Sequence, residues 1–450
     1  MNKTAGMGAI ACAVALAVAC GEDEPLGPGS GGAAGAGATG GGGTGGAAGS
    51  GGSAGSGGGS GGSAGADSGS GGTDAGPTPG RLLVAGTDFF SKTEVASVDL
   101  ATNQVLGSVT FDDGDAVPAQ SNGQGFVLER TKSKLHHLDA AGQLAKSIDV
   151  GQSAVGLSGT GSTNPVGVIA TESDSDGGKS WRAHVLLQLV NRVAVVDLSA
   201  GSVTKTIDLA AYQAGSDADG SVDMTSPVKH AGTGRIYLLL GRIDRTTVTA
   251  PSYQLACPSV KALLLAIDVA SDTLVDLNGS AAGEGIELSL VNPVDAALDV
   301  AQDRLLVLNA GCFAPADGGT IRVSHGVEAV DLGAGTTSTL YTAPNQDFLS
   351  RLLVRSSGQA LVNTFDPSFG EHWYPWATAQ ASFGAELSGV PAAPSLEDEG
   401  HLLGVSITTT DAGSNVEVVR YDLTAQTKVS VVASPWTGSF ASASGTALVR

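Results

Sequence analysis

Short apolar runs, separated by small polar turns, recur along the chain from residue 81 to residue 450. The clearest stretch has four of them: Val166–Ala170, His184–Leu189, Val193–Leu198 and Val203–Leu209. Short runs rich in Val, Ile and Leu and bounded by turn residues predict β-strands. Four such runs joined in succession predict one small antiparallel sheet.

An aspartate ends the third apolar run of most of these units. It occurs in phrases such as Ser-Val-Asp-Leu at 97–100 and Ala-Val-Asp-Leu at 329–332, and a small polar turn and another apolar run follow it. An Asp in this place accepts N–H groups of its own turn, so we expect a structural role. Repetition of one small sheet along the chain predicts a β-propeller. The six aspartates are Asp99, Asp139, Asp197, Asp268, Asp331 and Asp422.

The fold class predicted is therefore all-β, a propeller of seven blades with four antiparallel strands each, with six or eight blades as alternatives. The first unit, Arg81–Ala85, Glu94–Leu100 and Val105–Phe111, lacks a first strand. We expect residues 439–443 to supply it and so to close the ring; Thr446–Val449 has no place in this scheme. The remaining runs are Phe126–Arg130, Leu135–Asp139 and Leu144–Val150; Arg235–Leu240, Ala262–Val269 and Thr273–Leu277; Pro293–Leu298, Arg304–Asn309, Val327–Leu332 and Thr336–Tyr341; Leu352–Arg355, Ala360–Phe365 and Trp376–Ala379; and Leu402–Ile407, Val416–Leu423 and Lys428–Val432.

Two second-strand sequences, residues 235–239 and Arg304–Asn309, together with the six third-strand aspartates, carry a family resemblance. The pattern resembles the YVTN-type propeller repeats of surface-layer and YncE-like proteins, although the Tyr-Val-Thr-Asn string itself is absent. The resemblance covers residues 81–450. It implies the propeller fold and little about chemistry, because such propellers serve many functions.

The N-terminus has the pattern of an export signal over residues 1–19. Lys3 is followed by the apolar segment Ala9–Ala19, which is shorter than the ~20 residues of a transmembrane helix. The end of this segment, residues 16–20, resembles the lipobox of bacterial lipoproteins, with Ala17 where that family prefers Leu. The resemblance implies that Cys20 carries the lipid and that the protein lies at the outer membrane or cell surface. The alternative is an ordinary cleavage site at 17–19 and a soluble periplasmic or secreted protein.

Residues 20–80 form a second segment, the expected lipidated N-terminus and a tract of Gly, Ser, Ala and Thr. This tract has almost no apolar side chains to bury, so we expect a disordered tether with a root-mean-square span of roughly 45 Å. The predicted organisation is signal peptide 1–19, tether 20–80 and propeller 81–450.

Charge limits the partners. The chain has 23 Lys and Arg against 44 Asp and Glu, for a net charge of −21, and no basic cluster. Nucleic-acid binding is therefore not expected. We expect a monomer that meets the membrane only through its lipid and binds a protein or carbohydrate of the cell envelope.

Acidic and amide residues occur at the start of the expected inner strands, which converge on the mouth of a propeller's channel. Their oxygen atoms are suited to Ca²⁺, and the alternative is turn chemistry with a solvated acidic rim. No other cofactor and no catalytic residue is predicted. The candidates are Asp115, Asn164, Asp223, Asn292 and Asp347.

The two cysteines of the propeller segment, Cys257 and Cys312, lie in the expected loops between second and third strands of neighbouring blades. We expect a disulfide in an exported protein, with two free thiols as the alternative.

Four aromatic residues, His372, Trp373, Tyr374 and Trp376, form the main aromatic concentration, in an expected loop of the sixth unit. The loop is either a recognition surface or a satellite core. These features favour a binding or scaffold protein. The alternative is a propeller enzyme, a lactonase-like hydrolase with an axial calcium or a quinone-dependent dehydrogenase.

Overall fold

The computed structural model describes residues 80–450, apart from 89, 176–177, 215–217, 248–253, 280–283, 317–318, 345, 356–357, 369, 411–412, 439 and 441. The expected signal peptide, Cys20 and the tether up to residue 79 lie outside the described residues. Within the described ranges, no helix has the length and apolar character needed to cross a bilayer.

Seven antiparallel sheets form the blades, as the sequence pattern predicts. Blade 6 has three strands in the described part of the chain, and an isolated bridge from Trp373 to Leu387 lies beyond its third strand. From the inner strand outward, the blades are β30 (Ser442–Val449), β1 (Arg81–Thr87), β2 (Thr93–Asp99) and β3 (Gln104–Phe111); β4 (Ala116–Ser121), β5 (Gln124–Glu129), β6 (Lys134–Leu138) and β7 (Leu144–Asp149); β8 (Pro165–Ser175), β9 (Gly178–Leu187), β10 (Arg192–Asp197) and β11 (Ser202–Asp208); β12 (Met224–His230), β13 (Arg235–Leu240), β14 (Leu263–Asp268) and β15 (Thr273–Val275), with β16 (Ile286–Glu287) also on β14; β17 (Pro293–Asp299), β18 (Arg304–Asn309), β21 (Gly326–Asp331) and β22 (Thr336–Thr342); β23 (Phe348–Val354), β24 (Gln359–Phe365) and β25 (Glu371–Ala377); and β26 (Ala392–Leu396), β27 (His401–Thr410), β28 (Gly413–Asp422) and β29 (Thr427–Ala433).

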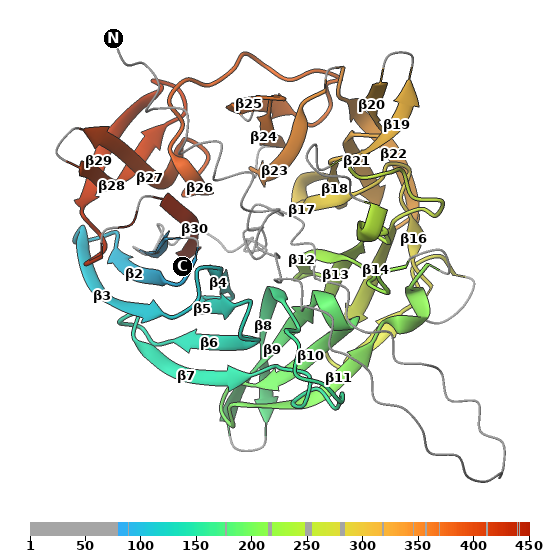
Figure 1. The fold of residues 1–450 in the computed structure, drawn as a ribbon, viewed down its shortest axis with the longest axis horizontal. Helices are drawn as coiled ribbons and strands as arrows, with labels where there is room; N and C mark the ends of the chain where they lie inside the picture. The colour runs from blue at the N-terminus through green and yellow to red at the C-terminus, as the bar shows by residue number, and fades with distance from the viewer. Residues whose placement is uncertain are drawn as a thin grey trace, which may run out of the picture. The chain divides into compact units, whose positions relative to one another are not determined.

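The blades pack side by side in a ring (Figure 1), and one apolar cluster lies between each neighbouring pair. Alternate residues of a strand pack against the blade on one side and the blade on the other. In β1, for example, Leu82 and Val84 pack against blade 7, whereas Leu83 and Ala85 pack against blade 2. Strands buried on both faces have continuous apolar runs, which is the pattern seen in the sequence.

The C-terminal strand β30 closes the ring by pairing with β1, from Arg81 opposite Val449 to Thr87 opposite Ser442. The predicted closure is therefore confirmed, but its predicted residues, 439–443, are wrong. The closing strand is Ser442–Val449, so the run that had no place in the prediction forms its second half. Ala447 and Val449 decide this register because they enter the apolar cluster between blades 1 and 2.

Three inner strands, β4, β12 and β26, lack the apolar pattern of the other strands and were not predicted. Each contains a proline: Pro118, Pro227 and Pro394. An inner strand is an edge strand with one partner in its sheet, so proline is tolerated there. Pro227 also packs on the inner strand of blade 3, where a Cβ on Gly167 would lie 2.6 Å from its ring.

The six repeated aspartates have the predicted structural role. Oδ1 of each accepts one or two N–H groups of the turn that follows the third strand, at N···O distances from 2.7 to 3.2 Å. Each aspartate thus stabilises its own hairpin, and these carboxylates are not available as a shared site.

Candidate functional site

The five predicted channel-mouth residues occupy one equivalent position, directly before the inner strands β4, β8, β12, β17 and β23. Three of them have left-handed backbones: Asn164 has φ 49°, Asp223 has φ 51° and Asn292 has φ 59°. Asn and Asp tolerate this conformation better than other non-glycine residues. The Asn or Asp at these three positions thus has a backbone cause, the left-handed turn into the inner strand.

Arg130 joins the positions of blades 2 and 3. Its Nη1 donates to Asp115 Oδ1 at 3.1 Å, and its Nε donates to Asn164 Oδ1 at 3.0 Å. Asn164 Nδ2 in turn donates to Gln188 Oε1 at 2.7 Å. Among the five candidates, Asp115 and Asn164 are the pair that this contact brings together.

Asp223 is buried in blade 4 and forms an ion pair with Arg245. Its side chain is 2 % exposed and accepts from Arg245 Nε at 2.5 Å and from the Ile243 N–H at 2.8 Å. Burial raises the pKa of this carboxyl, and Arg245 opposes that rise. The carboxylate therefore holds the loop that follows β13 against the start of β12.

Asn292 and Asp347 contact the insertion of blade 5. Asn292 Nδ2 donates to the Gly311 carbonyl at 3.2 Å. The Arg322 guanidinium lies 4.6 Å from the Phe313 ring centre and 5.3 Å from that of Phe348. Burial lowers the pKa of Arg322 to about 10, against the opposing charge of Asp347.

Among the described His, Cys, Asp and Glu side chains, no group of three at the channel mouth lies close enough together to hold a metal ion. Arginine side chains lie against Asp115 and Asp223, where a cation would otherwise be expected to bind. The three arginines of the channel mouth follow second strands or lie in the insertion after one. No spacing in the sequence distinguishes them from other arginines, so they were not predicted.

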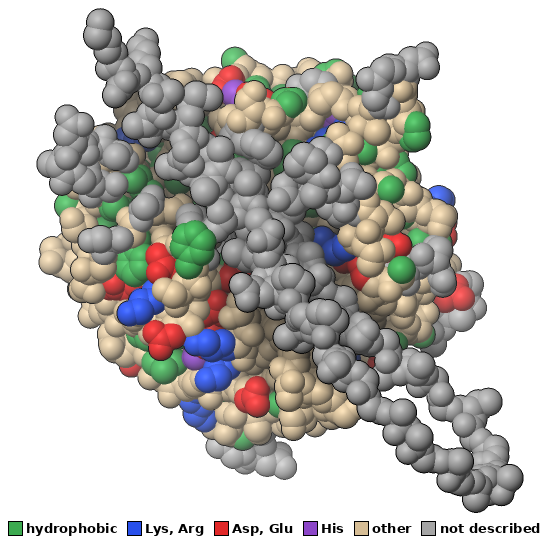
Figure 2. All heavy atoms as spheres, viewed as in Figure 1, with side chains coloured by type: hydrophobic (Ala, Val, Ile, Leu, Met, Phe, Trp, Pro, Cys, Tyr) green, Lys and Arg blue, Asp and Glu red, His purple; other side chains and the backbone are tan. Residues whose placement is uncertain are grey.

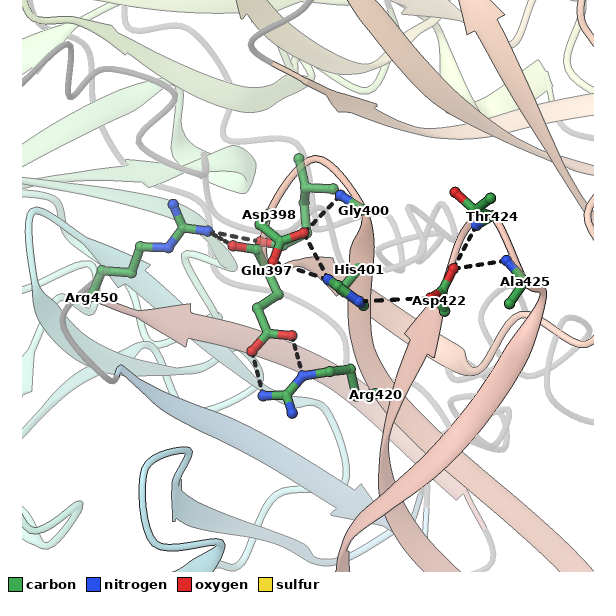
Figure 3. A network of polar contacts seen from close by, with 10 residues as sticks. Glu397, Asp398, Gly400, His401, Arg420, Asp422, Thr424, Ala425 and Arg450 are labelled. Carbon is green, nitrogen blue, oxygen red and sulfur yellow. Dashed lines mark hydrogen bonds and ion pairs between the residues drawn. The ribbon is translucent and has the colours of Figure 1, made fainter. Parts of the chain in front are cut away.

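A triad of possible metal ligands, Glu397, Asp398 and His401, lies at the opposite end of an inner strand, in the turn from β26 to β27 (Figure 3). Its ligand atoms lie within 4.8 Å of one another. Both Glu397 oxygens bind Arg420 at 2.6 Å, and His401 Nδ1 lies 3.0 Å from both Asp398 oxygens. The geometry is that of an ion-pair network in which the acidic side chains bind Arg420 and His401.

The predicted disulfide between Cys257 and Cys312 is present, with a Cα–Cα distance of 4.8 Å. It joins the residues between β13 and β14 to a hairpin of β19 (Cys312–Ala316) and β20 (Gly319–Val323) in blade 5. The Phe313 N–H donates to the Leu255 carbonyl at 2.8 Å. We call the described parts of these two connections, residues 241–247, 254–262, 310–316 and 319–325, the linked insertions.

The aromatic cluster is not a loop, which corrects the prediction. Residues 371–377 form β25, the third strand of blade 6, so the predicted strand at 376–379 was placed too late. Trp373 and Trp376 are 3 % and 1 % exposed, whereas His372 and Tyr374 are half-buried. The strand's usual aspartate is missing here, and the aromatic residues obscured its period.

A stack of rings covers the outer side of β25. Phe383 lies between Tyr341 of β22 and Tyr374, with ring-centre distances of 4.0 and 5.7 Å. His372 Nδ1 lies 2.8 Å from Glu386 Oε1, and this contact is the main cause of the raised pKa of His372. The rings face one another, so they act mainly as a satellite core between blades 5 and 6.

Charge on the surface is mixed. On the face drawn in Figure 2, Lys and Arg side chains are interspersed with Asp and Glu side chains. Large exposed apolar side chains of the described residues are spread over β3, β7, β20, β29 and connecting loops. On the face drawn, neither a patch of one charge nor a large apolar patch marks a recognition surface.

No family model and no curated protein matches the chain. The solved structures to which it is similar include a hydrazine synthase of Kuenenia stuttgartiensis, at 15 % identity and a TM-score of 0.37, over 65 % of this chain and 80 % of that one. They also include a functionally unknown protein from Desulfotomaculum acetoxidans, at 12 % identity and a TM-score of 0.48, over 82 % of this chain and 99 % of that one. Likeness at this level brings no function to the chain.

Proposed function

We propose that this protein is exported, is anchored by a lipid on Cys20, and binds a protein or carbohydrate of the cell envelope through the linked insertions. The observation that supports this proposal is the disulfide between Cys257 and Cys312. It joins two connections that belong to neighbouring blades and lie outside the seven blade sheets. Such elements are not needed to close the ring, so their rigid form favours a role in recognition.

Rigidity is the property that a binding surface gains from these contacts. The disulfide, the bond from Phe313 to Leu255 and the position of Arg322 between two phenylalanine rings hold the hairpin in one place. A surface ordered before binding loses less conformational entropy when a partner binds.

The outer part of the hairpin has the mixed chemistry of an interface. Ile321 is 45 % exposed, and Thr320 next to it donates to Gln254 Oε1 at 2.6 Å across the two insertions. An apolar side chain within a polar, ordered surround is a common form of interface centre.

Export is supported by the same disulfide, because such bonds persist in oxidising compartments. A Cys20→Ala variant tests the anchor: we expect it to move from the membrane fraction to the soluble fraction. Retention of that variant in the membrane fraction would contradict lipidation.

An Ile321→Asp variant tests the binding surface. The full chain is used to capture partners from an envelope extract, alongside Ile321→Asp and the control Val429→Asp, which alters an apolar side chain 65 % exposed on β29 of blade 7. We expect a partner that the native chain and the control retain and that Ile321→Asp loses at least tenfold, as for a central interface residue worth about 1.4 kcal/mol or more. Equal recovery with both variants would place the binding surface elsewhere.

A further inference from the structure

Phe90 and Ile321 are exposed apolar side chains that lie at the same end of their blades. Phe90 lies between β1 and β2 of blade 1, and Ile321 lies in the insertion of blade 5, so each follows the second strand of its blade. Neighbouring strands of a blade are antiparallel, so every connection between a second and a third strand lies on one face of the ring. The turns into the inner strands lie on that face as well, so it is the face of the channel mouth.

Phe90 is 77 % exposed, the highest value among the large apolar side chains of the described residues. One carboxylate holds its turn: Asp88 Oδ1 accepts the N–H groups of Phe90, Ser91 and Lys92 at 3.0, 2.8 and 2.8 Å, and Asp88 Oδ2 accepts the Ser91 hydroxyl at 2.8 Å. The Asp88 N–H also donates to the Lys92 carbonyl at 3.1 Å. An aromatic side chain on an ordered turn loses little conformational entropy when a partner buries it.

The base of this turn is tied to the connection between β3 and β4. Thr87 Oγ1 donates to the Gly114 carbonyl at 2.7 Å, and Thr93 Oγ1 donates to the Asp113 carbonyl at 2.7 Å; both threonines are fully buried. The hairpin that carries Ile321 is held by the disulfide. Both apolar side chains therefore project from fixed backbones, and their exposure is not the result of a loosely packed loop.

Blades 1 and 5 lie on opposite sides of the ring, with blades 2 to 4 between them on one side and blades 6 and 7 on the other (Figure 1). A monosaccharide or another small ligand contacts one of the two turns at most. A macromolecule with a broad surface reaches both, since an interface of usual size buries about 800 Å² and about 20–30 residues on each partner.

Charge and chemistry favour a protein among such macromolecules. The chain has 44 Asp and Glu against 23 Lys and Arg and no basic cluster, which disfavours nucleic acid and an anionic bilayer. The N-terminal segment also enters the propeller at the opposite end of the blades, where the Gly80 carbonyl accepts the Leu100 N–H at 3.1 Å. An isoleucine side chain makes no hydrogen bond to a polysaccharide, whereas aliphatic and aromatic side chains fill apolar pockets of proteins.

We propose that a single protein partner binds across the channel-mouth face and takes Phe90 and Ile321 into separate apolar pockets. The inference rests on the function proposed above, since Ile321 belongs to the linked insertions. It narrows the partner class from protein or carbohydrate to protein, and it extends the binding surface to blade 1.

Capture by the full chain from a detergent extract of the cell envelope tests this inference. One half of the extract is first digested with a protease that is then inhibited. The variants are Phe90→Ser and Ile321→Asp, and the control is Val300→Ser, which alters an apolar side chain 56 % exposed at the opposite end of blade 5. We expect one protein that the native chain and the control retain, that digestion removes, and that each variant loses by a factor of about ten or more, as for a central apolar contact.

Two changes at Asp88 test the ordered turn. Asp88→Ala keeps Phe90 but removes the acceptor of three N–H groups, so it should weaken capture of the same protein about threefold or more. Asp88→Asn keeps Oδ1 as an acceptor and should restore capture. Circular dichroism of each variant establishes that the fold is intact.

Retention of the protein by Phe90→Ser, when Ile321→Asp loses it, would overturn this inference and leave the proposed function standing. A captured component that survives the protease would overturn it in favour of a carbohydrate. Flotation of the Cys20→Ala chain with vesicles of phosphatidylethanolamine and phosphatidylglycerol, if Phe90→Ser abolishes it, would assign Phe90 to a bilayer and overturn the inference too. If the native chain retains nothing, the proposed function fails together with this inference.

Discussion

Asp295 of β17 ties three blades together, and replacing it with asparagine should remove a pH-dependent loss of stability. The carboxylate is buried at 3 % exposure; Oδ2 accepts the Leu352 N–H of blade 6 at 2.8 Å, and Oδ1 accepts the Ser226 hydroxyl of blade 4 at 3.0 Å. Burial raises its pKa from 3.8 to about 6, although these hydrogen bonds and the charge of Arg351 act in the opposite direction.

The sign of the effect follows from the direction of that shift. Between pH 3.8 and about 6 the folded state holds a proton on Asp295 that the unfolded chain has released, so the free energy of unfolding falls as the pH rises. A pKa difference of about two units corresponds to about 3 kcal/mol. This contribution is fully present below pH 3.8 and is lost above about pH 6.

Urea unfolding of the native chain and of Asp295→Asn, followed by tryptophan fluorescence from pH 4 to pH 7, measures the effect. The asparagine variant should be less stable than the native chain at pH 4, because its amide cannot accept all of the hydrogen bonds that the carboxyl group accepts. The difference between the two proteins should shrink by about 3 kcal/mol as the pH rises. Asp208→Asn, at a carboxyl with 59 % of its side chain exposed, serves as the control. Parallel curves for the native chain and Asp295→Asn would refute the reasoning.

Three further changes test the closure, the insertions and the turns. Gly86→Ala places a Cβ within 2.6–2.8 Å of Trp436 ring atoms and should cost about 1–3 kcal/mol; an unchanged melting temperature would contradict this packing. Replacing Cys257 and Cys312 together by alanine releases a link across 55 residues and should lower the free energy of unfolding by about 4 kcal/mol. The urea midpoint of unfolding measures this loss. A reductant should lower the midpoint of the native chain and leave that of the variant unchanged. Asp99→Ala removes two turn hydrogen bonds and should cost about 1 kcal/mol, with faster amide exchange confined to that turn; no change in exchange would argue against its structural role.

Local chemistry made the blades predictable from sequence. Strands buried on both faces give continuous apolar runs, and an aspartate at the end of a third strand binds its own turn whatever surrounds it. The channel-mouth positions were predictable for a similar reason, since the turn into an inner strand favours Asn or Asp with a positive φ. The disulfide followed from the placement of two cysteines in corresponding loops of neighbouring blades.

Other features depended on contacts with residues distant in sequence. The inner strands of blades 2, 4 and 7 contain proline and few apolar residues, because one edge is free of partners and burial comes from adjacent blades. The register of the closing strand was decided by Ala447 and Val449, which enter the apolar cluster between blades 1 and 2. The aromatic sequence at 372–376 is a strand because blade 6 pairs it with β24.

The sequence by itself thus determined the repeat, the propeller class and the role of the repeated aspartate, since each depends on hydrogen bonds and burial patterns within a few residues. Tertiary structure alone decided which oxygens meet which arginines at the channel mouth. Arg130 reaches Asn164, 34 residues away, only because neighbouring blades pack in a ring. Contacts of that kind leave no periodic signal in the chain.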